Sequence, residues 1–181
     1  MKRALLVIAA ALAVAVVARA DAVVRPHVDV PRENDARARR PPTKPGWATD
    51  DEAHVRALFE AIQRDAPEHA RDFFFPRDPF LVLKGIADPG HYWDILFRHY
   101  ERDIHALHAS TPGIDHATYA RFEMSRRATW QAPRTEANAL PYWAVRHSRI
   151  HFDVGGHDQT IELHVVINWG PRWFVTHLAA P

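Results

Sequence analysis

The sequence predicts an α+β fold in which N-terminal helices pack on a curved, cone-like antiparallel sheet of four strands. Apolar residues recur at helical spacing from Thr49 to about residue 111, and after Gly113 the spacing changes to every second residue. Helices that all precede the strands are typical of α+β domains, whereas α/β folds alternate the two. In a chain of 181 residues we therefore expect a single α+β domain over residues 49–181.

Residues 1–20, ahead of that domain, have the layout of a secretory signal peptide. A basic start at 1–3 precedes an apolar run at 4–17 and an Ala-Arg-Ala ending at 18–20. The run is shorter than the roughly 20 residues of a membrane-spanning helix, and the chain has no cysteine to carry a lipid. We expect cleavage after Ala20, which leaves a soluble periplasmic or secreted protein with no stable membrane anchor.

The segment that follows, residues 21–48, is rich in proline, arginine and aspartate and has no sustained apolar period. Such a composition buries too little apolar surface to offset the entropy of ordering the chain. A disordered linker is therefore predicted over 21–48.

The first helix is expected to begin at Thr49, because Thr49 and Glu52 have the spacing of a capping box. Pro67 either ends this helix or starts a short second one. One apolar stripe recurs at i, i+3, i+4 and i+7 and comprises Val55, Leu58, Phe59 and Ile62.

A second long helix is predicted after Asp88, which is placed as N-cap, with Pro89 at the first helical position. Residues 73–83, between the two helices, are too apolar to lie in water and should cross the core as irregular or short helical structure. The long helix should end near Thr111. Its apolar arc comprises Trp93, Leu96, Phe97, Tyr100, Ile104 and Leu107.

Four strands are predicted at 118–130, 142–154, 159–169 and 172–178. If Gly155 and Gly156 form a two-residue turn, Ile150 pairs with Ile161 and Arg149 pairs with Glu162, so apolar meets apolar and opposite charges meet. A second turn at Gly170 pairs Ile167 with Phe174 in the same way.

The same two registers align three histidines on one sheet face. His147 is opposite His164, and His164 is opposite His177, with His151 and the Arg149–Glu162 pair beside them. Neutral imidazoles on neighbouring strands can share a zinc ion and leave one position for water, so His147, His164 and His177 are candidate zinc ligands. A polar solvent face, or a surface that responds to pH, explains the same pattern.

Other features of the sequence exclude several classes of function. The formal net charge of +1 favours neither nucleic acid nor an anionic membrane as a partner. No phosphate loop, dinucleotide fingerprint or nucleophile elbow occurs, so apart from the zinc hypothesis no cofactor is expected. Arg126, Arg127 and Trp130 could hold an anion at the end of the first strand, although charges that protect an edge strand explain the arginines equally well.

The order of the elements, ending in the sequence Asn-Trp-Gly-Pro-Arg-Trp-Phe-Val at 168–175, resembles the cystatin-like α+β cone of the nuclear transport factor 2-like superfamily, which includes ketosteroid isomerase-like proteins. The resemblance implies a pocket between the helices and the curved sheet. Members use such a pocket for acid–base chemistry or for non-catalytic ligand binding and dimerisation. No catalytic residue of that superfamily can be matched to a position in this chain.

Two functions remain open from the sequence. The first is an exported, non-catalytic domain that binds a small ligand or a protein partner through the pocket or the sheet face, with a homodimer through the sheet as one form. The second is a small acid–base or metal-assisted enzyme that uses the histidines. The candidate ligand or interface residues are His147, His164, His177, His151, Arg149, Glu162 and Trp173. A pocket containing titratable groups with shifted pKa values would favour the enzyme, whereas an exposed sheet face around Trp173 would favour an interface.

Overall fold

The computed structural model describes residues 25–38 and 41–179. The predicted signal peptide, 1–20, lies outside the described residues. Within them, no helix combines the length and the apolar character needed to span a membrane.

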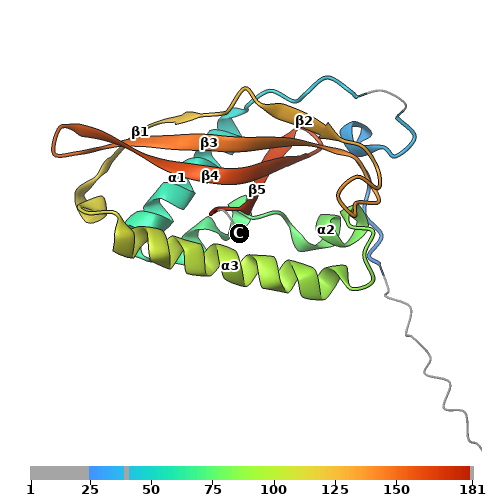
Figure 1. Ribbon diagram of the computed structural model, residues 1–181, viewed down its shortest axis with the longest axis horizontal. Coiled ribbons are helices and arrows are strands. Elements are labelled where there is room, and N and C mark those ends of the chain that lie inside the picture. Colours follow the sequence, from blue (N-terminus) through green and yellow to red (C-terminus); the bar gives the residue numbers. More distant parts are fainter. Residues whose placement is uncertain (1–24, 39–40, 180–181) are drawn as a thin grey trace, which may run out of the picture.

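The protein has the predicted α+β class, with helices and sheet in separate layers (Figure 1). In Figure 1 the long helix α3 runs along one side of the sheet, and α1 crosses behind strands β3 and β4. The helical elements are η1 (Arg32–Asn34), α1 (Thr49–Arg64), η2 (Pro67–Phe73), α2 (Arg77–Leu83), α3 (Pro89–Ser110) and η3 (Ile114–His116). The strands are β1 (Thr118–Glu123), β2 (Ala128–Gln131), β3 (Tyr142–Val154), β4 (His157–Trp169) and β5 (Arg172–His177).

The sheet is antiparallel and open and has five strands, so the prediction of four strands was wrong. The strand expected at 118–130 is divided into β1 and β2, which both pair with β3. Between them the Ser125 N–H donates to the Ser148 hydroxyl instead of continuing the ladder, at 3.2 Å. On β3 the irregularity coincides with His147, whose φ of 59° lies in the left-handed region. An irregularity of this kind changes the direction in which the side chain of that residue points.

The hairpin of β3 and β4 has the predicted register. Ile150 pairs with Ile161, Arg149 pairs with Glu162, and Val154 pairs with His157 across the turn. Gly155 and Gly156 both have positive φ, at 60° and 87°, as the expected two-residue turn requires.

The register of β4 with β5 is only partly as predicted. Ile167 pairs with Phe174, but a bulge beyond Val166 places His177 opposite Val165, not opposite His164. The extra residue is Thr176, and the His164 N–H donates instead to the carbonyl of Leu178 at 3.1 Å. One inserted residue shifts the following side chains by one position, so the three-histidine row is interrupted at its third member.

The core lies between the sheet and the apolar stripes of α1 and α3. Phe59 of α1 contacts Phe152 of β3 with ring centroids 5.5 Å apart, and the Tyr100 hydroxyl of α3 donates to the carbonyl of Ala70 at 3.0 Å. Asp88 caps α3 as predicted and accepts from the His91 N–H at 2.9 Å. Phe97 lies at the rim of the core, stacked on Trp93 at 5.0 Å.

The start of α1 differs from the predicted capping box. The N-cap is Ala48, and the side chain that reaches back is Asp51, which accepts from the Ala48 N–H at 2.9 Å. Asp51 is fully buried and also accepts from Arg172 Nε and from the Trp173 N–H, each at 3.1 Å. This single carboxylate therefore joins the beginning of α1 to the beginning of β5.

The segment expected to be a disordered linker differs from that expectation at residues 25–38 and 41–48, where it lies against the domain. Asn34 is fully buried: its Nδ2 donates to the carbonyls of Pro141 (2.9 Å) and Asn168 (3.3 Å), and its Oδ1 accepts from the Gly170 N–H (2.7 Å). Further along, the Trp173 indole N–H donates to the carbonyl of Gly46 at 3.1 Å. Polar contacts with distant backbone groups, which composition does not reveal, hold the segment in place.

Candidate functional site

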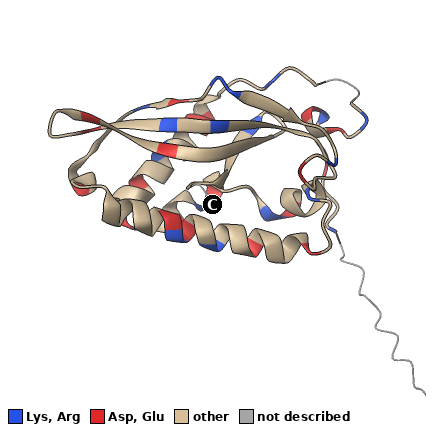
Figure 2. Cartoon of the chain, viewed as in Figure 1, with Lys and Arg blue, Asp and Glu red and all other residues tan. Residues whose placement is uncertain are grey.

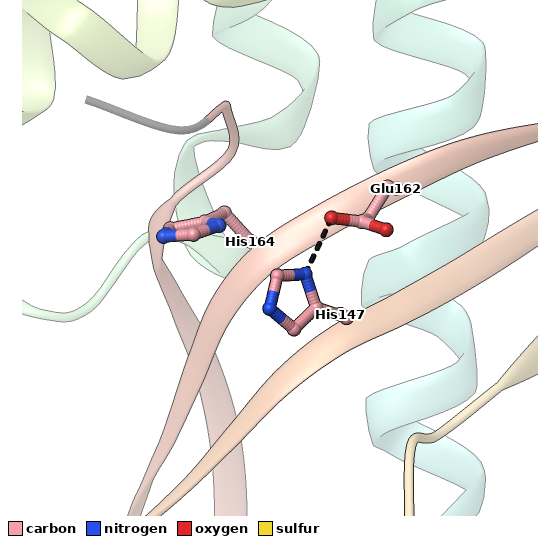
Figure 3. Close-up of side chains that lie close together, drawn as sticks. All are labelled: His147, Glu162 and His164. Carbon is pink, nitrogen blue, oxygen red and sulfur yellow. Dashed lines mark hydrogen bonds and ion pairs between the residues drawn. The ribbon is translucent and has the colours of Figure 1, made fainter. Parts of the chain in front are cut away.

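Two groups of polar side chains could form a site, and they lie in different places. The first is the remainder of the histidine row, His147 of β3 with Glu162 and His164 of β4 (Figure 3). His147 Nδ1 lies 2.6 Å from a Glu162 carboxylate oxygen, and the rings of His147 and His164 meet edge to face with centroids 5.3 Å apart. The pKa of His164 is lowered, first by burial and then by the neighbouring His147. We call these three residues the His–Glu cluster.

The other predicted site residues do not join this cluster. His151 is buried, with its Nε2 3.1 Å from Glu123, and its Nδ1 makes no hydrogen bond within the described structure. Trp173 is fully buried under residues 44–46, with Lys44 Nζ 5.4 Å from its ring centroid, so it cannot belong to an exposed sheet interface. His177 lines a cavity, as described below.

Arg149 lies at a hollow beside the His–Glu cluster. The hollow has a volume of about 490 Å³ and is lined by Glu123, Ser125, Arg126, Arg127, His147, Arg149 and Glu162. In Figure 2, basic positions on β3 lie beside an acidic position on β4. We call this feature the arginine hollow. Of the three residues that could hold an anion, Arg126 and Arg127 line this hollow together with Arg149, whereas Trp130 does not.

The second group lies between α2, α3 and the sheet, where the resemblance implied a pocket. An inner chamber of about 60 Å³ adjoins an outer groove of about 210 Å³. The two share four lining residues: Tyr92, Leu96, Thr176 and His177. Phe80, Val165 and Ile167 provide apolar walls for the chamber. We call the two together the helix–sheet cavity.

Polar groups from three separate elements meet in the inner chamber. Glu136 accepts from the Tyr142 hydroxyl at 2.8 Å and from Arg146 at 3.1 Å, and its backbone carbonyl accepts from Lys84 Nζ at 3.3 Å. The loop that carries Glu136 is held by buried Asn138, whose Nδ2 donates to the carbonyls of Ala132 (3.0 Å) and Leu140 (2.8 Å).

Two basic side chains of the chamber, Lys84 and His177, have lowered pKa values. Burial lowers the pKa of Lys84 below its ordinary value, against the opposing effect of Glu136. Burial also lowers the pKa of His177, and His164, Lys84 and Arg146 act in the same direction. His177 Nδ1 lies 3.2 Å from the Thr176 hydroxyl, which is uncharged. In both groups burial makes the charged form less favourable than it is in water.

Sequence reasoning did not select Lys84, Glu136, Tyr142 or Arg146. These four residues come from the end of α2, a loop and β3, and none belongs to a recognisable motif. Alternation along β3 places Tyr142 and Arg146 on one face, which was the available signal, but it gives no reason to expect Glu136 beside them.

The comparisons with known proteins identify no relative. No protein-family model matches the chain, and neither a curated protein nor a solved structure matches it significantly. The likeness to nuclear transport factor 2-like proteins thus depends on the order of elements alone and stays a hypothesis.

All four tyrosines of the protein are expected to ionise only when it unfolds. Burial raises the pKa of Tyr92, Tyr100, Tyr119 and Tyr142 above the ordinary value of 10.0. Above about pH 10 the folded state binds more protons than the unfolded state, so the contribution of these tyrosines to stability is fully present below about pH 10 and is lost as pH rises further. Tyrosinate absorbance and circular dichroism, followed together during alkaline titration, should change in one transition. Tyrosinate formation in a protein that keeps its folded spectrum would contradict this expectation.

Proposed function

We propose that this protein is an exported domain that binds a small, partly apolar anion in the helix–sheet cavity. The observation that carries the proposal is the convergence of Lys84, Arg146 and His177 on a chamber that also has apolar walls, formed by Phe80, Leu96, Val165 and Ile167. Pockets with apolar walls and a few convergent polar groups are typical of small-molecule sites. Export is supported by the composition of residues 1–20.

The charge and size of the cavity define the ligand class. Two basic side chains, Lys84 and Arg146, line the chamber, and the Glu136 carboxylate neutralises the charge of one of them. The other basic group remains for an anionic ligand. The chamber of about 60 Å³ has room for an acidic group, and the groove of about 210 Å³ for a small apolar body. Both are below the range of roughly 300–1,000 Å³ for drug-sized ligands, which favours a ligand such as a short-chain or aromatic carboxylate.

A second candidate function, acid–base catalysis in the same cavity, is favoured by the lowered pKa values of Lys84 and His177. A base whose pKa is lowered by burial releases its proton more readily than it does in water, and can exchange a proton with a bound molecule. The two candidates differ in outcome: a binding domain returns its ligand unchanged, whereas an enzyme converts it. Analysis of a bound carboxylate after prolonged incubation separates them.

Calorimetric titration with benzoate and with uncharged benzyl alcohol tests the binding proposal. We expect benzoate to bind better than the alcohol, and the Lys84→Met variant to weaken benzoate binding by about tenfold or more, because a hydrogen bond to a charged group contributes roughly 1.5–3 kcal/mol. Lys44→Met removes a lysine that lies outside the cavity and is the matched control. Equal binding of both probes, or benzoate binding that Lys84→Met leaves unchanged, would contradict the proposal.

A further inference from the structure

We propose that His147, Glu162 and His164 form a binding site for one divalent transition-metal ion, with a remaining coordination position open toward the arginine hollow. This site is on the sheet and is separate from the helix–sheet cavity, so the inference goes beyond the proposed function and does not depend on it. The ligand set is two imidazoles and one carboxylate, in which Glu162 occupies the role that the sequence assigned to His177.

The backbone places the three side chains on one face of the sheet. Glu162 and His164 are two residues apart on β4 and therefore point to the same side, and His147 comes from the neighbouring strand (Figure 3). Directly opposed residues on neighbouring strands have Cβ atoms about 5 Å apart, and the left-handed backbone at His147 re-aims its ring. The arrangement brings three ligands of a single ion together from two strands.

The ligand atoms already lie close to the separations that a metal requires. One nitrogen or oxygen from each residue lies within 4.8 Å of the other two. Ligands at 2.0–2.2 Å from a tetrahedral zinc ion are about 3.3–3.6 Å from one another, so side-chain rotations that move the ligand atoms by up to about 1.5 Å complete the set. The side chains of His147 and Glu162 are half exposed, which leaves them free to make these rotations.

The chemistry of the set selects transition metals over calcium or magnesium. Imidazole nitrogen suits zinc, copper, nickel and iron, whereas calcium and magnesium require oxygen ligands. Three protein ligands on one face leave at least one further position for water or an exogenous ligand. A set of this composition therefore gives an accessible ion and not a closed structural one.

The open position faces a surface suited to anions. His147 and Glu162 line the arginine hollow together with Arg126, Arg127 and Arg149. Among the described residues, none of these three arginines is within ion-pair distance of a carboxylate. Guanidinium groups beside a metal ion bind phosphate or carboxylate oxygens, so an oxyanion is the expected exogenous ligand.

Titration of the full, untagged chain with Co²⁺ and with Zn²⁺ tests the site. We expect one equivalent of Co²⁺ to give the visible absorption of a low-coordinate ion, and Zn²⁺ to displace it. His164→Ala and Glu162→Gln should each weaken binding by about 100-fold, because even the outer hydrogen-bond partners of metal ligands are worth roughly 10–100-fold in affinity. His157→Ala, an exposed histidine at the β3–β4 turn, is the matched control and should bind as the wild type does.

Two results would overturn the proposal. The metal site is wrong if folded wild-type protein takes up neither ion, or if the Glu162→Gln variant, which conserves size and is expected to fold, binds both ions as tightly as the wild type. The open position is tested separately with inorganic phosphate, which should shift the Co²⁺ spectrum in the wild type and shift it less in Arg149→Ala. A spectrum that phosphate does not change would show that the fourth position does not face the arginine hollow.

Discussion

Replacing Asp51 by alanine is expected to lower the free energy of unfolding by about 3 kcal/mol or more. The carboxylate is fully buried and accepts hydrogen bonds from Ala48, Arg172 and Trp173. Its removal leaves the buried N–H of Trp173 without that partner and a guanidinium without its buried counter-charge. Arg172 is about a third exposed, so water can recover part of the loss, which keeps the expected value at the lower end of the range for broken buried pairs.

Asp50→Ala is the matched control for that experiment. Asp50 also contacts Arg172, with its Oδ2 3.0 Å from Nη1 of the arginine, but the Asp50 side chain is 75 % exposed. An exposed ion pair contributes about 1 kcal/mol or less. Urea unfolding of the two variants should therefore give clearly different losses. Equal losses would mean that the burial of Asp51, and its contacts with the backbone, do not stabilise the fold as we infer.

Asn34→Ala is expected to cost about 2–4 kcal/mol, although residue 34 precedes the predicted domain boundary. The substitution leaves the carbonyls of Pro141 and Asn168 and the N–H of Gly170 without the side-chain partner that each now has. Each buried polar group that loses its partner costs roughly 1–3 kcal/mol, and such costs do not simply add. The measurement is urea unfolding, with the exposed neighbour Arg32→Ala as the control.

The prediction for Asn34→Ala is contradicted by an unchanged unfolding midpoint. If Asn34→Ala and Arg32→Ala both unfold at the wild-type urea concentration, the hydrogen bonds of Asn34 add nothing to stability.

The parts of the fold that follow from periodic patterns were predicted correctly. The apolar stripe and N-cap of α3 and the register of β3 with β4 are local or nearest-neighbour features, and both are as predicted. The predictions failed where one residue departs from the pattern. The break near Ser125 and the bulge at Thr176 each insert a residue that alternation alone does not reveal.

The candidate site was predicted in part for the same reason. His147 and His164 are neighbours because the β3–β4 register is as predicted, while His177 is displaced by a bulge on the next strand. Glu162 entered the sequence analysis as the partner of Arg149 across the strands, and in the structure its carboxylate lies against His147. The helix–sheet cavity could not be predicted, because its polar residues come from elements whose packing distance is set only by the whole core.

The hydrogen bonds of Asn34 also imply an order of events during folding. The β3–β4 hairpin closes through a two-residue turn, whereas Asn34 and Gly170 are 136 residues apart in the chain. Long-range closures carry a larger entropic cost and usually form after local ones, so the Asn34 contacts should be absent from the transition state for folding. The loss of stability in Asn34→Ala should then appear as faster unfolding with an unchanged refolding rate, and slowed refolding would instead place this N-terminal contact in the folding nucleus.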